Sequence, residues 1–263
     1  TTILVIEPSL LEKDMLWVAT DDGRVHYTQN GGNEWNEVSN NLSGLPKGSW
    51  ITQIKASNKN KGEALLVAND YRRFNYEPYA YRTTNYGKSW QRIVDKDDVL
   101  SYALCIIEDP VEKNLLFLGT DDGLYLSIDA GISWTKWTNG FPTVSVKDLV
   151  IQERENDLII GTFGRAAWVL DDLKPLRSIA KNNEVLASDI VLFEAPEAYQ
   201  VSFQQPTGSR FGADAIFQGE NRVYGARIPY YFQKKNEENS KDIDPSEKNE
   251  EKEEEEDVDE KIT

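Results

Sequence analysis

The sequence is poor in the residues from which many catalytic and metal sites are built. It has a single cysteine, Cys105, and a single histidine, His26, among 263 residues. One cysteine excludes an intrachain disulfide framework, and one histidine excludes any site that needs two imidazoles. Cys105 stands in an apolar segment, where a buried small side chain is expected. We therefore expect no bound metal and no cofactor.

Long apolar runs and an excess of basic residues are also missing. No stretch approaches the roughly 18 apolar residues of a membrane-spanning helix. The 45 acidic and 29 basic residues give a net charge of −16, which argues against nucleic acid and against an anionic membrane surface as partners. Residues 234–263 contain 14 acidic and 6 basic residues and no aromatic, so we expect a disordered acidic tail.

Four similar segments follow one another along the chain. In each, an apolar strand ends near a corresponding position, and these positions are 49, 51 and 42 residues apart: Thr20, Asn69, Thr120 and Thr162. A second apolar strand precedes each of them, and a glycine-containing or polar turn follows. A repeat of about 40–50 residues with four short strands has the size of a β-propeller blade.

The sequence therefore predicts an all-β fold of about four four-stranded antiparallel blades. We assign residues 1–172 to the blades, 173–233 to a linker, with one short helix, and a small β extension, and 234–263 to the acidic tail. The apolar opening residues resemble the middle of a strand, which favours an open arc of blades over a closed four-bladed ring.

A motif recurs at the turn after the third strand of the first three segments. In the third segment it is Ser127-x-Asp129-x-Gly131-x-x-Trp134, and the first two have asparagine in place of the aspartate: Asn30, Gly32 and Trp35, then Asn85, Gly87 and Trp90. Glycine permits a positive φ, and a short polar side chain bonds local backbone amides. The tryptophan offers apolar area for packing between blades. The motif thus predicts a structural turn.

This pattern resembles the Asp-box, or BNR, repeat of β-propellers such as sialidases, xyloglucanases and the sortilin (VPS10) ectodomain. The likeness is strongest, over roughly residues 1–172, to bacterial sortilin-like BNR-repeat proteins often labelled glycosyl hydrolases. It implies further blades or domains on a longer chain and a secreted or bacterial-envelope location. It also implies boxes on the outer edge of the propeller, which favours a structural over a catalytic role for Asp129.

The second segment carries an insertion of about six residues. From Asn69 to Trp90 there are 21 residues, against 15 and 14 in the neighbouring segments. Tyrosine and arginine dominate binding hot spots, so we predict a recognition surface here and at the turn of the fourth segment. Its residues are Tyr71, Arg72, Arg73, Phe74, Tyr76 and Tyr79, with Arg165. The other interpretation is that the insertion packs over the next blade, and both stay open.

Three functions are compatible with the sequence. The first is a non-catalytic, extracellular or envelope-associated module that binds protein or glycan through its loops. The second is a sialidase-like or xyloglucanase-like glycoside hydrolase, and the third is an architectural fragment of a larger secreted protein. The carboxylate pairs Asp21-Asp22, Asp121-Asp122 and Asp171-Asp172 suit hairpin turns better than hydrolysis, because adjacent strand residues point to opposite faces. We assign no catalytic residue.

Overall fold

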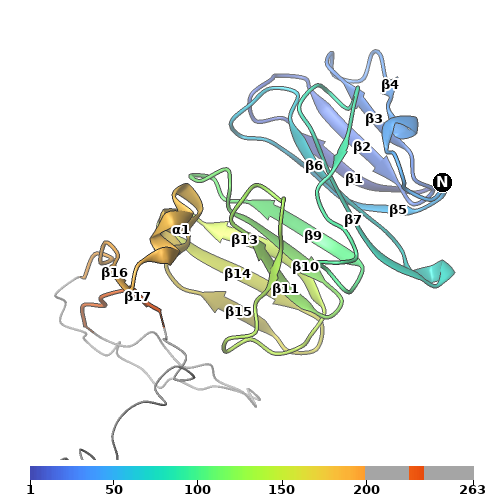
Figure 1. Cartoon of the computed structure of the whole chain (residues 1–263). Coiled ribbons are helices and arrows are strands. Elements are labelled where there is room, and N and C mark those ends of the chain that lie inside the picture. The colour runs from blue at the N-terminus through green and yellow to red at the C-terminus, as the bar shows by residue number, and fades with distance from the viewer. Residues whose placement is uncertain (199–224, 234–263) are drawn as a thin grey trace, which may run out of the picture.

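Four antiparallel sheets follow one another along the chain, as Figure 1 shows. The structure is a computed structural model that describes residues 1–198 and 225–233. In each of the four sheets the strands pair in the order in which they occur in the sequence. The prediction of an all-β architecture is confirmed.

The first two sheets, blades 1 and 2, have four strands each. Blade 1 consists of β1 (Ile3–Pro8), β2 (Leu16–Thr20), β3 (Val25–Thr28) and β4 (Asn36–Glu37), and is followed by the 3-10 turn η1 (Ser39–Asn41). Blade 2 consists of β5 (Trp50–Ala56), β6 (Ala64–Asp70), β7 (Asn75–Thr83) and β8 (Gln91–Arg92), with the 3-10 turn η2 (Tyr71–Arg73) between β6 and β7.

Blade 3 has four strands and blade 4 has three among the described residues. Blade 3 consists of β9 (Ala103–Glu108), β10 (Leu116–Thr120), β11 (Gly123–Ser127) and β12 (Thr135–Lys136). Blade 4 consists of β13 (Val146–Gln152), β14 (Asp157–Thr162) and β15 (Ala167–Leu170), so the expected fourth strand is not found in the described part of the chain. The chain continues with α1 (Lys174–Lys181), the 3-10 turn η3 (Asn183–Ala187) and a separate hairpin of β16 (Ile190–Leu192) and β17 (Tyr230–Phe232).

The strand register corrects one detail of the sequence alignment. Ala64 pairs with Thr83, as Leu116 pairs with Ser127 and Leu16 with Thr28. Ala68, rather than Asn69, therefore corresponds to Thr20 and Thr120. Asn69 instead occupies the place of Asp21 and Asp121, the first residue of the turn.

The hydrophobic core consists of three layers, one between each pair of successive blades. The central strands β6 and β10 are buried on both faces, so each contributes side chains to two layers. In blade 2 one row across the sheet, Ile54, Leu66 and Tyr81, packs against blade 1. The matching rows face the preceding blade in blade 3 (Ile106, Leu118, Tyr125) and in blade 4 (Leu149, Ile160, Trp168).

The outward faces of the two end blades have no such cover among the described residues. In blade 1 the matching row is Ile6, Val18 and His26, and Ile6 is 64% exposed. At the other end, Val150, Ile159 and Val169 pair across blade 4, and Val169 is 57% exposed. The described blades thus form an arc with apolar side chains exposed at both ends.

The turn that contains Asp129 is built on side-chain hydrogen bonds. The Ser127 hydroxyl donates to Asp129 Oδ1 over 2.7 Å, and the backbone N–H of Gly131 donates to the Ser127 hydroxyl over 2.9 Å. Asp129 Oδ1 also accepts the backbone N–H of Ser133 over 2.9 Å. Gly131 has a φ of +92°, and a Cβ there would lie 3.0 Å from the Cβ of Ile93 in blade 2. The turn therefore needs glycine for its conformation and for its close contact with the preceding blade.

The two turns that contain asparagine repeat this pattern. In the first, Asn30 Oδ1 accepts from the Thr28 hydroxyl and from the backbone N–H of Glu34, over 3.0 and 2.9 Å. In the second, Asn85 Oδ1 accepts from the Thr83 hydroxyl and from the backbone N–H of Ser89, over 3.1 and 2.9 Å. The acceptor oxygen, rather than the charge, is thus the feature that the turns share.

The tryptophan of each turn lies toward the preceding blade. Trp134 Nε1 donates to the Ile93 carbonyl of blade 2 over 2.7 Å, and Trp90 packs edge-on against Trp17 of blade 1 at 5.9 Å between ring centroids. Trp134 and Trp90 are 6% and 7% exposed, whereas Trp35 of blade 1 is 45% exposed. The exposure of Trp35 follows from its place on the outward face of blade 1.

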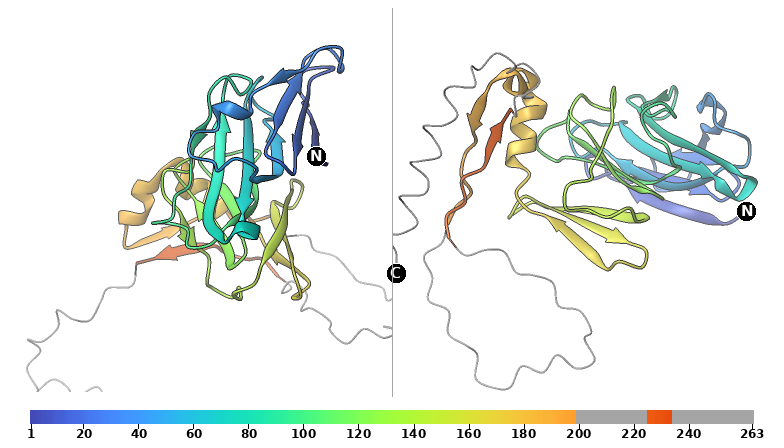
Figure 2. Two further views of the ribbon diagram at one scale, coloured as in Figure 1. Left: turned by 90° about the vertical axis from the view of Figure 1, so that its right-hand side faces the viewer. Right: turned by 60° about the horizontal axis from the view of Figure 1, so that its bottom comes forward.

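Helix α1 is attached to blade 3 as well as to blade 4. Arg177 forms hydrogen bonds with both carboxylate oxygens of the fully buried Asp109, each at 2.9 Å from Nε, and also bonds Asn156. Leu173 and Ala180 are buried in the layer between the two blades. Figure 2 shows the helix at the end of the arc opposite the N-terminus.

We predict that the third turn tolerates asparagine but not alanine at position 129. Burial alone would raise the pKa of Asp129, but hydrogen bonds from Ser133, Ser127 and Ile132 outweigh it and hold the pKa below its usual value. Asp129→Ala should lower the free energy of unfolding at pH 7 by about 1–2 kcal/mol, and Asp129→Asn by less than about 0.5 kcal/mol. Urea unfolding measures both.

The effect of Asp129→Ala on the free energy of unfolding should depend on pH. Because the folded-state pKa is lowered, the stabilisation is present above the unfolded-state pKa and is lost as the pH falls through the folded-state pKa. The difference between wild type and Asp129→Ala should therefore shrink below about pH 4. An undiminished difference at pH 3 would contradict this role of the carboxylate.

Candidate functional site

The first strand of each blade (β1, β5, β9 and β13), which we call the inner strand, starts beside the turn between the second and third strands of the same blade. The N–H of Asp121 donates to the Tyr102 carbonyl over 3.3 Å, and in blade 2 Trp50 pairs with Asn69 in the strand register. We call this end of the blades the upper rim. It comprises Thr2, Asp21, Trp50, Asn69, Tyr102, Asp121, Ser145 and Phe163.

The insertion lies on the upper rim of blade 2 and is folded. β6 continues to Asp70, residues 71–73 form η2, and Phe74 takes a left-handed conformation with φ of +61° before β7 begins. The Arg73 guanidinium pairs with the Asp70 carboxylate over 2.6 Å. The extra residues thus lengthen the hairpin and close it with a helical turn, which fixes the direction of the side chains.

A stack of rings and a guanidinium joins the insertion to blades 2 and 3. The Arg72 guanidinium lies 3.2 Å from the Trp50 ring centroid and 4.6 Å from that of Tyr71. Tyr71 in turn stacks on Tyr102 of blade 3 at 4.7 Å. Burial raises the pKa of the Tyr102 hydroxyl well above its usual value, and a hydrogen bond with Asp121 adds to the effect. The insertion therefore does pack over the next blade.

Other side chains of the insertion are exposed to solvent, although the Tyr76 ring also lies 6.1 Å from that of Tyr102 between centroids. Phe74 is 84% exposed and Tyr76 is 54% exposed. Arg72 and Arg73 are exposed as well, although each has the contact described above. The structure thus combines the two interpretations that the sequence left open: Tyr71 packs on the neighbouring blade, and the tip of the insertion is accessible.

Two predicted binding residues lie apart from this surface. Tyr79 is buried, its hydroxyl accepts a hydrogen bond from Asn75 Nδ2 over 2.9 Å, and the Arg92 guanidinium lies over its ring. Tyr79 therefore packs in the layer between blades 1 and 2 and does not reach the exposed surface of the insertion. Arg165 is exposed on the β14–β15 turn, two blades away from the insertion.

Sequence reasoning missed the residue beneath the insertion. The side chain of Asn69 is 1% exposed, and neither its Oδ1 nor its Nδ2 has a hydrogen-bond partner among the described residues. It lines a hollow of about 80 Å³ whose other lining residues are Gly48, Trp50, Asp70, Arg72 and Arg73. Correct alignment would have given a signal, since Asn69 replaces the aspartate found at this place in blades 1 and 3.

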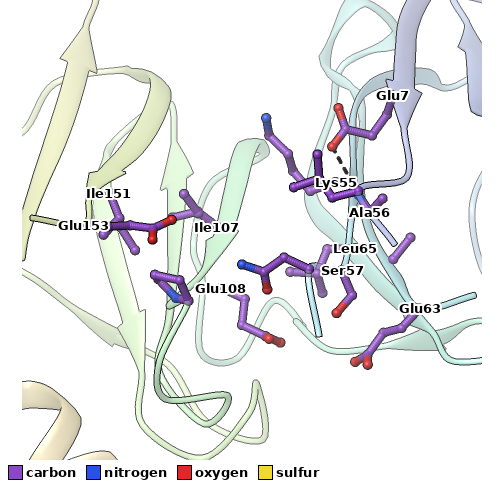
Figure 3. A pocket seen from close by; sticks show the side chains of 14 residues that line it. Glu7, Lys55, Ala56, Ser57, Glu63, Leu65, Ile107, Glu108, Ile151 and Glu153 are labelled. Carbon is purple, nitrogen blue, oxygen red and sulfur yellow. Dashed lines mark hydrogen bonds between the residues drawn. The ribbon is translucent and has the colours of Figure 1, made fainter. Parts of the chain in front are cut away.

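A larger hollow of about 330 Å³ opens at the other end of the inner strands, which we call the lower rim. Figure 3 shows Glu7, Lys55, Glu108 and Glu153 around it. Glu7 accepts the backbone N–H of Ala56 over 3.2 Å, and burial raises the pKa of its carboxyl group, although Lys55 opposes the shift. This half-buried carboxyl group is the residue of the hollow best suited to donate a proton.

Two other carboxylates of the lower rim are held in ion pairs. Arg82 Nη1 lies 2.8 Å from a carboxylate oxygen of Glu63 and 2.8 Å from one of Glu108. Lys59 Nζ lies 3.4 Å from the other oxygen of Glu108. These pairs join blade 2 to blade 3. Within residues 1–198 and 225–233, no group of three or more His, Cys, Asp and Glu side chains is placed to hold a metal ion.

The adjacent aspartates act in turns and in an ion pair. The Thr20 hydroxyl donates to Asp22 Oδ1 over 2.5 Å, and the Thr120 hydroxyl donates to Asp122 Oδ1 over 2.7 Å. Asp171 lies 3.2 Å from Arg227 Nη1. These contacts give the pairs a structural explanation.

The fold is that of β-propeller blades, and the solved structures that it resembles are propellers. The xyloglucanase of glycoside hydrolase family 74 from Xanthomonas campestris superposes with a TM-score of 0.52 and 17% identity, covering 65% of this chain and 29% of that one. The family 74 enzyme of Niastella koreensis superposes with a TM-score of 0.52 and 16% identity, covering 65% of this chain and 28% of that one. The chain thus spans less than a third of either structure, and at these identities the likeness shows the fold alone.

No protein-family model and no curated protein matches the sequence. The narrower resemblance to sortilin-like Asp-box proteins therefore stays a prediction. In the part of the chain that the structure describes, no helix has the length and apolar character needed to cross a membrane.

We predict that the buried tyrosines resist ionisation. Burial raises the pKa of Tyr81 to about 12 and also raises that of Tyr102. Because the folded-state pKa is raised, the neutral phenol stabilises the fold below the unfolded-state pKa near 10, and this is lost as the pH rises through the folded-state value. An ultraviolet titration distinguishes tyrosines that ionise in the folded protein from those that ionise only when it unfolds at high pH. Tyr102→Phe should reduce the second group by one. Loss of a tyrosine that ionises near pH 10 would contradict the assignment.

Proposed function

We propose that this chain is a non-catalytic binding module, extracellular or in the bacterial envelope, that takes a protein or glycan ligand on the upper rim of blade 2. The observation that carries the proposal is the exposure of Phe74 and Tyr76 on a folded insertion. Aromatic and arginine side chains supply most of the free energy at binding hot spots. The location follows from the resemblance to secreted and envelope propellers.

The base of the insertion supports recognition because it is ordered before a ligand arrives. The stack of Trp50, Arg72, Tyr71 and Tyr102 crosses from blade 2 to blade 3. Asp70 and Arg73 pair beneath the tip. A preorganised surface loses less conformational entropy on binding than a loose loop, so a small contact area can suffice.

Substitution of the exposed rings tests this proposal. Phe74→Ala and Tyr76→Ala should each weaken ligand capture on glycan and peptide arrays by at least about tenfold. The melting temperature of Phe74→Ala should stay within a few degrees of wild type, because Phe74 is 84% exposed, whereas Tyr76→Ala also removes a contact with the Tyr102 ring. Ile132→Ala is the matched control, since Ile132 is also exposed but lies on the turn between β11 and β12.

Capture that is equal in wild type and in both ring variants would refute the assignment to the insertion. A chain that captures nothing on either array would favour the third function, an architectural fragment of a larger secreted protein.

Glycoside hydrolysis is the rival function, and the half-buried Glu7 in the lower hollow is the observation that favours it. A carboxyl group with a raised pKa suits a general acid. Steady turnover of aryl glycosides or β-glucans that is lost in Glu7→Gln would support a sialidase-like or xyloglucanase-like enzyme. It would overturn the non-catalytic proposal.

We further propose that the chain is one segment of a larger propeller, with further blades on a longer chain. The rows on the outward faces of blades 1 and 4 correspond to rows that are buried between the described blades. Trp35 likewise occupies in blade 1 the position that Trp90 and Trp134 occupy in blades 2 and 3, where they pack on the preceding blade. Further blades would bury these apolar side chains, which otherwise cost solubility.

Charged substitutions on the two outward faces test this second proposal. Ile6→Lys combined with Val169→Lys should reduce binding of a hydrophobic dye and self-association of the isolated chain, without lowering its melting temperature. Ile132→Lys is the control for an added charge elsewhere. Unchanged dye binding and association would show that these faces do not act as open blade surfaces.

A further inference from the structure

The hollow beneath the insertion contains a buried amide that lacks hydrogen bonds. Asn69 offers one acceptor oxygen and two N–H donors, and none of them is used by the described residues. A buried polar group without a partner costs about 1–3 kcal/mol. The hollow of about 80 Å³ is large enough for several atoms of a ligand. A group that both donates and accepts, such as a hydroxyl, fits this amide.

The charge around the hollow is positive. Arg72, Arg73 and Asp70 line it, and Asp70 pairs with Arg73. Arg72 has no carboxylate within ion-pair distance in the part of the chain that the structure describes, and its contacts are the Trp50 and Tyr71 rings. A guanidinium stacked on an aromatic ring keeps its N–H edge free for a carboxylate. One anionic group is therefore expected beside Asn69.

The surroundings restrict the size and shape of that ligand. The chain carries a net charge of −16, so a densely charged polyanion would be repelled by the rest of the protein. The exposed Phe74 and Tyr76 rings of the same insertion offer flat apolar faces, which suit the face of a sugar ring. A ring that bears one carboxylate and neighbouring hydroxyls meets all three conditions.

We propose that this site binds a uronic acid residue of a glycan, a ligand class that rests on the binding function proposed above. The carboxylate accepts from the Arg72 guanidinium, and a hydroxyl group donates to Asn69 Oδ1 and accepts from Asn69 Nδ2. Phe74 or Tyr76 contacts the adjoining sugar. The ligand enters the hollow with its polar edge only, since the volume is smaller than a whole ring requires.

Titration calorimetry with two matched oligosaccharides tests the proposal on the whole chain. The probes are an otherwise neutral oligosaccharide that bears one glucuronic acid residue and the same oligosaccharide with that carboxyl group reduced to an alcohol. Wild type should bind the acidic probe at least about tenfold more tightly than the reduced one. Arg72→Gln should remove this preference. Arg154→Gln, which removes an exposed charge on blade 4, should leave it unchanged.

Substitution of Asn69 gives a second test of the site. Asn69→Leu is close in size and should weaken binding of both probes by about tenfold, because both carry the hydroxyl groups. Should the substitution disturb folding, as judged by melting temperature, Asn69→Asp is the alternative. Asn69→Asp should weaken binding of the acidic probe more than binding of the reduced one, because the new carboxylate repels that of the probe.

The outcomes separate this inference from the proposed function. Equal binding of both probes by wild type, or binding of the acidic probe that is unaffected by Arg72→Gln and by the Asn69 variants, overturns the uronic acid site. If a neutral glycan or a peptide is nevertheless captured through Phe74 and Tyr76, the binding function stands without it. If no array ligand depends on the two rings, the binding function fails as well.

Discussion

The packing of each sheet on the face of the sheet before it is the interaction on which the rest of the structure depends. No blade here has a core of its own, because a small sheet can bury its two faces only against neighbours. The central strands of blades 2 and 3 are therefore apolar on both faces. The turns serve this packing, since the tryptophans and the close contact at Gly131 also lie toward the preceding blade.

This arrangement explains where recognition can develop. Side chains inside the sheets are committed to packing, so the rims are the places where residues can be added without disturbing a layer. Blade 2 carries such an addition on its upper rim, where Tyr71 of the longer β6–β7 hairpin stacks on Tyr102 of blade 3. The proposed binding residues and a contact that joins two blades thus come from the same insertion.

Much of the fold could be predicted from the sequence, because strand alternation and the turn motif are local signals. The segments around Trp35, Trp90 and Trp134 show the repeat directly. The candidate site is harder to predict from the sequence. The composition of residues 70–81 indicates recognition, but strand direction decides that Tyr79 points inward. Asn69 became visible only through the strand register, since a one-residue shift in alignment moves a side chain to the other face of the sheet.

The attachment of α1 determines how mechanical load would enter the propeller from the C-terminal side. Arg177 grips the buried Asp109, so tension on the segment after α1 reaches blade 3 directly. Arg177 also bonds Asn156 on the β13–β14 turn, and the Leu173 N–H donates to the Asn156 carbonyl, so blade 4 carries part of the same load. The helix would thus divide tension between two blades.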